Sequence, residues 1–300
     1  MSNAKHDVTI ILPVVKTEFL ESCIKSLESS TDVDNLKIEL LIINVGKLDL
    51  SGFCDSSQLT CVILDRFGAD YKSAVIYGIS KSNSDLIALM NDDDVVHPMR
   101  LSRQFEMLSG GETDVAITGM KAFGQNQKTF SINLLPKSHF HYRYLWLGPY
   151  GANATWMFQK SWFERHIGSS LEGSNFDWKF SLIAFKTSSI KYDFEPLYFY
   201  RQHENQLTKE SNYRNSLATD MMDFLVDDIR VQFQFTPTKS VVKALAFPYL
   251  QNKVSSQTLF DLSKISIKLL FSKETFSIWL IYHLVLRFGC ACYWWTKGEH

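Results

Sequence analysis

Three consecutive carboxylates follow an apolar run in the segment LIALMNDDDVVHP, residues 86–98. Asp92, Asp93 and Asp94 repel one another when they are ionised, so a cation beside them lowers their energy. Carboxylate oxygens are the ligands that Mg²⁺ and Mn²⁺ prefer, and Mg²⁺ usually takes further ligands from water and a substrate phosphate. The cluster therefore favours a divalent-cation site. An acidic helix N-terminus with Asp94 as its cap explains the same residues equally simply.

Several short strand-like segments, alternating with helical patterns, would position this cluster. Residues 8–15, VTIILPVV, form a β-branched run typical of a strand buried on both faces of a parallel sheet. Further strands are expected over residues 38–45, 61–65, 86–90, 114–120, 155–159 and 190–201, and helices over 18–30, 72–82, 98–108, 176–186 and from 161. The alternation predicts an α/β fold with a mostly parallel sheet. Ligands bind such sheets at the carboxyl ends of the strands, where the aspartates lie.

The composition excludes some partners and favours a compartment. Apolar residues make up 45 % of the chain and charged residues 21 %, an ordinary globular balance. A formal net charge of -1 gives no overall field to attract nucleic acid. Five cysteines at irregular spacing argue against a disulfide framework and for free thiols in a reducing compartment. The polar N-terminus lacks a signal-peptide pattern, so we expect a cytoplasmic location.

The C-terminal part of the chain, residues 209–300, is expected to be a helical extension, basic and aromatic. Residues 239–300 hold eight Lys or Arg and three Asp or Glu, a net charge of +5 against -6 for the rest. Residues 276–295 are long enough to cross a membrane, but His283 and Arg287 lie inside this run on one helical stripe. The stripe favours either a helix lying in the membrane interface or a helix packed on the catalytic domain or a second copy of the chain.

The order of these motifs resembles that of the family 2 glycosyltransferases of the GT-A fold, from about residue 8 to residue 208. The matching segments are ILPVVKTEFLESCIKSL, SAVIYGISKSNSDLIALMNDDD, DDVVHPMRLSRQ, FDWKF and EPLYFYRQHENQLT. The resemblance implies a catalytic domain over residues 1–208, Rossmann-like in its sheet. It also implies transfer of a sugar, with inversion, from a nucleotide diphosphate sugar, most simply a UDP-sugar, to a hydroxyl of a glycan or lipid-linked acceptor in surface polysaccharide synthesis. The implied cofactor is Mn²⁺ or Mg²⁺.

Carried over by position, the resemblance also implies roles for individual residues. Asp177 would be the catalytic base that takes the proton of the acceptor hydroxyl, and Asp93 and His203 would hold the metal. The expected donor-binding residues are Pro13, Val14, Asn44, Lys72, Asn91, Asp92 and Arg201, and the expected acceptor-side residues are Asp94, Trp156 and Trp178. For the two tryptophans, core packing is the alternative, and Asp94 is equally suited to orienting the site.

The nucleotide-binding half departs from the family pattern. Val15-Lys16 stands where the family commonly has Tyr-Asn, and Asn44-Val45-Gly46-Lys47 where it often has Asp-Asp-Gly-Ser. Asn44 still offers a carbonyl oxygen to a uracil imide and an amide donor to other bases, so the base stays open. These losses allow a second function, a non-catalytic binding or scaffold subunit of a polysaccharide-assembly complex. The retained Asp93, Asp94, Asp177 and His203 argue against it.

Overall fold

A computed structural model describes five longer segments of the chain, an isolated helix and a few short pieces. These are residues 6–30, 35–54, 59–124, 152–168, 176–206, 221–222, 224–227, 229–230, 241–242, 245, 256–270 and 284. Its contacts divide the chain into two compact units. The first comprises Met1–Asn133, Gly151–Phe176 and Ile183–Glu204, and the second Leu134–Tyr150, Asp177–Leu182 and Asn205–His300.

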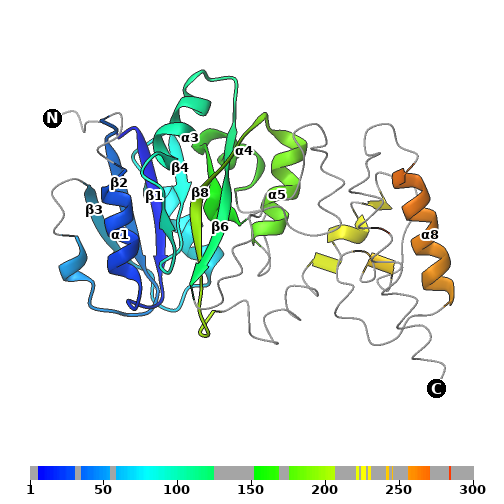
Figure 1. Ribbon diagram of the computed structural model, residues 1–300, viewed down its shortest axis with the longest axis horizontal. Helices are drawn as coiled ribbons and strands as arrows, with labels where there is room; N and C mark the ends of the chain where they lie inside the picture. Colours follow the sequence, from blue (N-terminus) through cyan, green and yellow to red (C-terminus); the bar gives the residue numbers. More distant parts are fainter. Residues whose placement is uncertain are drawn as a thin grey trace. The chain divides into compact units, whose positions relative to one another are not determined.

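One sheet is the scaffold of the first unit (Figure 1). Its strands within the described residues are β1 Val8–Val14, β2 Ile38–Asn44, β3 Thr60–Asp65, β4 Leu86–Leu89, β5 Val95–Val96, β6 Val115–Gly124, β7 Trp156–Gln159 and β8 Ile190–Gln202. They lie in the order β3-β2-β1-β4-β7-β6-β8-β5. The pairs β3-β2, β2-β1, β1-β4 and β6-β8 are parallel, whereas β7 runs antiparallel to β4 and β6, and β5 antiparallel to β8. The predicted mostly parallel α/β fold is confirmed.

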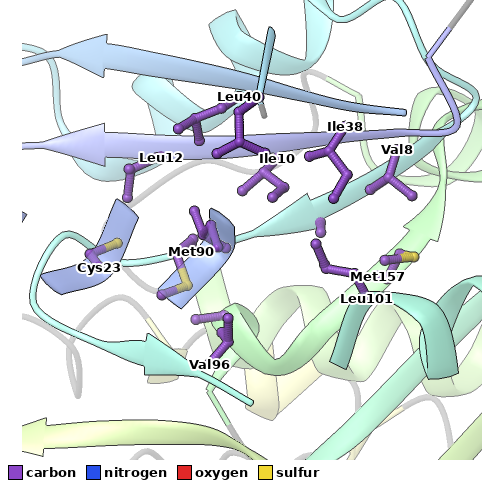
Figure 2. Packing of buried hydrophobic residues seen from close by; sticks show 14 of the residues in the cluster. Val8, Ile10, Leu12, Cys23, Ile38, Leu40, Met90, Val96, Leu101 and Met157 are labelled. Atoms are coloured by element: carbon purple, nitrogen blue, oxygen red, sulfur yellow. The ribbon is translucent and has the colours of Figure 1, made fainter. Parts of the chain in front are cut away.

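Helices cover both faces of this sheet. They are α1 Leu20–Glu28, α2 Tyr71–Lys81, α3 Arg100–Ser109 and α4 Lys160–His166, with the 3-10 turns η1 Ser51–Phe53 and η4 Asn153–Thr155. A further helix, α5 Phe176–Thr187, is divided between the two units. Alternate residues of β1 and β2 point to one face, where they pack with α1 and α3; Figure 2 shows Ile10, Leu12 and Leu40 there with Cys23 and Leu101. Residues between them point to the other face, where a Cβ on Gly78 of α2 would meet Ile11 and Ile43.

The strands and helices predicted from the sequence agree with those of the structure, apart from local differences. Each strand expected before residue 205 is present, and β6 extends to Gly124. The helix expected from Pro98 begins at Arg100. The two-residue strand β5 was not predicted, because its valines directly follow three aspartates.

The expectation that all cysteines are ordinary thiols is wrong for two of them. Cys54 and Cys61 form a disulfide across the connection from η1 to β3, with their Cα atoms 5.2 Å apart. The two cysteines are seven positions apart in the sequence, so the bond closes a single short loop and is no framework. Disulfides persist in oxidising surroundings, and the expected reducing compartment therefore loses the support it drew from the cysteines.

The second unit is described mainly by α8, Ser256–Leu270. Leu262 and Ile265 are buried, while Phe260 and Ile267 are more than half exposed, so the helix has an inner and an outer face. The run 276–295 lies outside the described residues except for Leu284, which is helical and buried. Among the helices that the structure describes, none has the length and apolarity to cross a membrane.

Candidate functional site

Asp93 and His203, the two expected metal ligands, lie close together at the carboxyl edge of the sheet. Asp93 follows β4 and His203 follows β8, and Asp93 Oδ2 lies 3.0 Å from His203 Nε2. Their side chains are 25 % and 13 % exposed, so the pair is partly accessible to solvent. His203 Nδ1 is buried and has no hydrogen-bond partner among the residues that the structure describes. In the described part of the chain no three His, Cys, Asp or Glu side chains gather closely enough to bind a metal, so Asp93 and His203 stand as a pair.

Asp94 is fully buried and ties the aspartate segment to β8. Its carboxylate accepts hydrogen bonds from the Tyr198 hydroxyl at 2.5 Å, the Arg201 backbone N–H at 2.7 Å and the Asn91 amide at 3.0 Å. Burial and the nearby charge of Asp93 raise the pKa of Asp94 to about 7, against the lowering effect of these three donors. Because Asp94 has no exposed surface, it cannot contact an acceptor substrate in this structure. Its role here is to position the neighbouring residues.

Asp92 ties the same segment to β1 on the opposite side. Its Oδ2 accepts hydrogen bonds from the backbone N–H groups of Val15 at 2.8 Å and Lys16 at 3.1 Å. Burial raises the pKa of Asp92, and the two backbone donors act against this. Asp92 therefore shapes the turn after β1, which the sequence assigned to donor binding.

Arg201 is held above the aspartate segment by several contacts. Its Nε donates to the backbone oxygen of Asp93 at 2.7 Å, and its Nη2 to the Ser22 hydroxyl at 3.0 Å. The guanidinium carbon lies 4.4 Å from the centre of the Phe19 ring and 4.6 Å from that of Phe123, within range for cation–π attraction. The Phe19 ring also lies 5.0 Å from the His203 ring. Phe19 thus contacts both Arg201 and His203, the two side chains that lie against Asp93.

A fully buried arginine, Arg100 of α3, contacts several elements that position the site. Its Nη2 donates to the backbone oxygens of Leu89 at 3.1 Å and Ala154 at 2.5 Å, and its Nε to Gln104 Oε1 at 3.1 Å. Its guanidinium carbon lies 5.0 Å from the centre of the Tyr198 ring. Burial lowers the pKa of Arg100 to about 10, which leaves it charged at neutral pH. Arg100 therefore joins the end of β4 to η4 and places a positive charge near Tyr198.

Asn91 begins a polar cluster on the β7 side of β4. The Tyr71 hydroxyl lies 3.4 Å from Asn91 Oδ1 and 3.3 Å from Asn153 Oδ1. Asn153 is 3 % exposed, and within the described segments its Nδ2 has no hydrogen-bond partner. Asn91 thus donates to Asp94 while its oxygen faces Tyr71, a residue that the sequence analysis did not single out.

The remaining expected donor-binding residues lie at the ends of β1 and β2 and in α2, and all of them are buried or half-buried. Asn44 is 3 % exposed, and its amide is bound within the protein. Pro13 and Val14 are buried in β1, and the Val14 oxygen accepts the N–H groups of Val45 and Gly46. Lys72 lies half-buried in the first turn of α2.

The expected acceptor-side tryptophans are both buried. Trp156 in β7 has no exposed surface and Trp178 in α5 is 3 % exposed, so core packing, the alternative reading of both, describes them in this structure. Asp177 lies in the first turn of α5, and its side chain lies outside the described residues. Asp177 and Trp178 belong to the second unit, whereas Asp93 and His203 belong to the first.

Comparisons with known proteins identify the family and the fold of the chain. The sequence profile of the family "Glycosyl transferase family 2" matches residues 9–167, more than half of the chain. Curated proteins give no match. Among solved structures, S. aureus TarS 1–349 in complex with UDP-GlcNAc is similar at a TM-score of 0.59 and 12 % identity, over 95 % of this chain and 81 % of that one.

Two further structures of S. aureus TarS show the same likeness. S. aureus TarS 1–349 in complex with UDP matches at a TM-score of 0.53 and 12 % identity, over 95 % of this chain and 89 % of that one. The longer S. aureus TarS matches at a TM-score of 0.53 and 12 % identity, over 79 % of this chain and 42 % of that one. At this identity the likeness establishes the GT-A fold, and with the profile match it shows that the chain belongs to glycosyl transferase family 2.

Proposed function

We propose that this glycosyltransferase moves a sugar, with inversion, from a nucleotide diphosphate sugar to a hydroxyl of a glycan or lipid-linked acceptor. The observation that carries the proposal is the pairing of Asp93 Oδ2 with His203 Nε2, 3.0 Å apart at the carboxyl edge of the sheet. The pair is partly exposed, and two backbone-anchored aspartates flank its acid. Of the neighbouring structures, one holds UDP-GlcNAc and another UDP, which supports a nucleotide sugar as the donor.

The donor set of this pair fits Mn²⁺ or Mg²⁺. Neighbouring ligands of an octahedral ion with bonds of about 2.1 Å are about 3 Å apart, and the two atoms lie 3.0 Å apart. A carboxylate oxygen and an imidazole nitrogen suit Mn²⁺, and the diphosphate oxygens of a donor and water would complete the ligand set. The ion would neutralise charge that develops on the leaving diphosphate.

The remaining chemistry falls to residues of the chain. The acceptor oxygen attacks the anomeric carbon, the bond from that carbon to the diphosphate oxygen breaks, and the nucleoside diphosphate leaves with the bonding electrons. Asp177 takes the acceptor hydroxyl proton, a role that rests on its position in the family pattern. Arg201, held on the aspartate segment, adds positive charge near the diphosphate.

Nucleotide release in the presence of a panel of nucleotide sugars tests this proposal. The purified chain is incubated with Mn²⁺ or Mg²⁺ and with each donor, with and without a glycan acceptor. We expect the wild type to release nucleotide from at least one donor. Asp93→Ala, His203→Ala and Asp177→Asn should each reduce the rate of release by about a hundredfold or more. His166→Ala is the matched control, because His166 is an exposed residue of α4, and it should leave release unchanged.

The scaffold function predicts a different pattern. A non-catalytic subunit would release no nucleotide with any donor or metal, and the four variants would match the wild type. That outcome would remove the transferase proposal.

We further propose peripheral membrane contact through the basic C-terminal part, where residues 239–300 carry a charge of +5. Co-sedimentation of the full chain with vesicles tests this. We expect binding to vesicles rich in phosphatidylserine and little to phosphatidylcholine alone. A variant with Lys239, Lys243 and Lys253 changed to Gln should bind less; equal binding would leave oligomerisation, checked by sedimentation velocity, as the role of this part.

A further inference from the structure

Asn44 ends β2, where the base of the donor is expected to bind, but its side-chain amide is not exposed to a ligand. Asn44 Nδ2 donates to the backbone oxygen of Leu48 at 2.9 Å and to Asp65 Oδ1 at 3.2 Å, and its Oδ1 accepts the Leu48 N–H at 3.0 Å. The side chain is 3 % exposed. Both of its N–H groups are therefore used within the protein, and the base must be recognised by another group.

Asp65 is the polar side chain that Asn44 holds at this edge. It ends β3 and lies directly opposite Asn44 in the parallel ladder. The residue is exposed, and in the described part of the chain Asn44 is the hydrogen-bond partner of its carboxylate. A carboxylate has lone pairs on both oxygens. Because Asn44 takes Oδ1, Asp65 Oδ2 is left to accept an N–H from a ligand.

Phe67 lies two residues further on, in a turn fixed to the end of β2. The Ala69 N–H donates to the Arg66 oxygen at 3.2 Å, and Gly68 has a φ of +70°, as the third residue of a type II turn requires. The Arg66 and Gly68 N–H groups donate to the oxygens of Asn44 and Val45, both at 3.0 Å. The turn is thus tied to β2, while the Phe67 side chain is 52 % exposed.

A second apolar side chain borders this edge on the β1 side. Val15 follows β1, the neighbour of β2 opposite to β3, and is 55 % exposed. The chain after β2 is held close to it, since a Cβ on Gly46 would lie 2.4 Å from the Val15 oxygen. Exposed apolar side chains therefore stand on both sides of the end of β2.

We propose that Asp65 and Phe67 bind the nucleobase of the donor, with the Phe67 ring stacked on the base and Asp65 Oδ2 accepting an imide N–H. This inference rests on the proposed function and names the base. One free carboxylate oxygen matches the single N3–H of uracil. Cytosine presents a lone pair at N3, which the carboxylate repels. The acid that recognises the base stands on β3, and Asn44 of β2 orients it.

Calorimetric titration of the purified chain with nucleoside diphosphates tests the proposal without any need for turnover. We expect UDP to bind more tightly than CDP, ADP or GDP. UDP methylated at N3, which lacks the imide proton, should bind about tenfold more weakly than UDP. Dihydro-UDP, whose base is not planar, should also bind about tenfold more weakly, because it stacks poorly on Phe67.

Variants assign these losses to the two side chains. Asp65→Ala should weaken UDP binding about tenfold and abolish the difference between UDP and N3-methyl-UDP, as a double-mutant cycle requires. Phe67→Ala should weaken UDP binding about tenfold and abolish the difference in affinity between UDP and dihydro-UDP. Phe67→Tyr keeps an aromatic ring and should retain both. Asp7→Ala is the matched control: the Asp7 carboxylate also accepts one N–H, from Lys37 at 2.8 Å, but precedes β1 at the opposite edge of the sheet.

The outcomes separate this inference from the function on which it rests. If no nucleoside diphosphate binds the wild type, both are wrong. The base assignment is wrong if nucleotides bind without preference for uracil, or if N3-methylation weakens UDP binding as much in Asp65→Ala as in the wild type. The transferase proposal stands in either case.

Discussion

The Tyr198 hydroxyl donates a 2.5 Å hydrogen bond to the buried Asp94 carboxylate, across 104 positions of the sequence. Tyr198 lies in β8, and Asp94 lies between β4 and β5, directly before Val95. The bond therefore ties the segment that leaves β4 to β8, a strand that is not a neighbour of β4 in the sheet. His203 and Arg201 follow Tyr198 along the chain, and both contact Asp93. The bond therefore helps to hold the proposed metal ligand His203 against its partner acid.

Tyr198→Phe should destabilise the fold and loosen metal binding. Removing the hydroxyl takes one of three donors from a buried carboxylate, which costs about 1–3 kcal/mol in the free energy of unfolding. The concentration of Mn²⁺ that gives half-maximal nucleotide release should rise, because β8 positions His203. Urea denaturation and a Mn²⁺ titration measure the two effects. Tyr77→Phe is the control, since Tyr77 lies on α2 at the second face; a response equal to that of Tyr198→Phe would contradict the prediction.

The stability of the metal-free chain should fall as the pH rises from about 4 to about 7. The pKa of Asp94 is about 7 in the folded protein and about 3.9 when unfolded. Folding therefore takes up a proton in this window, so the stabilisation is complete below the unfolded pKa and is lost as the pH rises through the folded pKa.

Asp94→Asn should remove this contribution. A single carboxyl group can change the free energy of unfolding by at most about 1.4 kcal/mol per pH unit. Urea denaturation at several pH values, with a chelator present, compares the free energy of unfolding of the variant and the wild type. Identical pH profiles would show that Asp94 titrates normally.

Asp92→Ala should weaken donor binding more than it slows the chemical step. The variant loses the acceptor of the Val15 and Lys16 N–H groups, so the turn after β1 loses its fixed shape. We expect the KM for the nucleotide sugar to rise about tenfold, with a smaller change in kcat. Asp92→Asn keeps one acceptor oxygen and should recover much of the affinity. A loss confined to kcat would instead place Asp92 in the chemistry.

Arg100→Met should strongly destabilise the fold. The substitution leaves the oxygens of Leu89 and Ala154 buried without their donor and removes a positive charge near buried Asp94, at a cost of about 3–5 kcal/mol. Arg103→Met on the same helix is the control, because Arg103 is exposed and should change the free energy of unfolding by less than about 0.5 kcal/mol. Guanidinium denaturation measures both, and equal stabilities would refute the structural role.

The sequence predicted the sheet well because buried parallel strands carry a strong local signal. Continuous β-branched runs such as residues 8–14 and 38–44 need both faces covered, and the structure covers them. The sequence singled out Asp93 and His203 as metal ligands only through the order of family motifs. Nothing in the spacing of two residues 110 positions apart brings them together.

The partners of each side chain were beyond sequence reasoning. Asn44 and Asp65 are each ordinary polar residues at strand ends, and only the parallel register places them opposite each other. A similar limit applies to Arg100, which reads as a surface residue of an amphipathic helix. Its burial depends on carbonyl groups from β4 and η4 that converge on it in three dimensions. Cys54 and Cys61 were misjudged because an odd cysteine count says nothing about one local pair.

The distance in sequence between β4 and β8 has a consequence for how the protein is made. On the ribosome, the aspartate segment emerges about a hundred residues before Tyr198 and Arg201, with an entropic cost of closing the intervening loop. Until they arrive, Asp94 has only Asn91 as a donor and favours water over the interior. We expect the half-synthesised sheet to stay open at this edge, so that the catalytic edge is completed late in folding, once β8 docks.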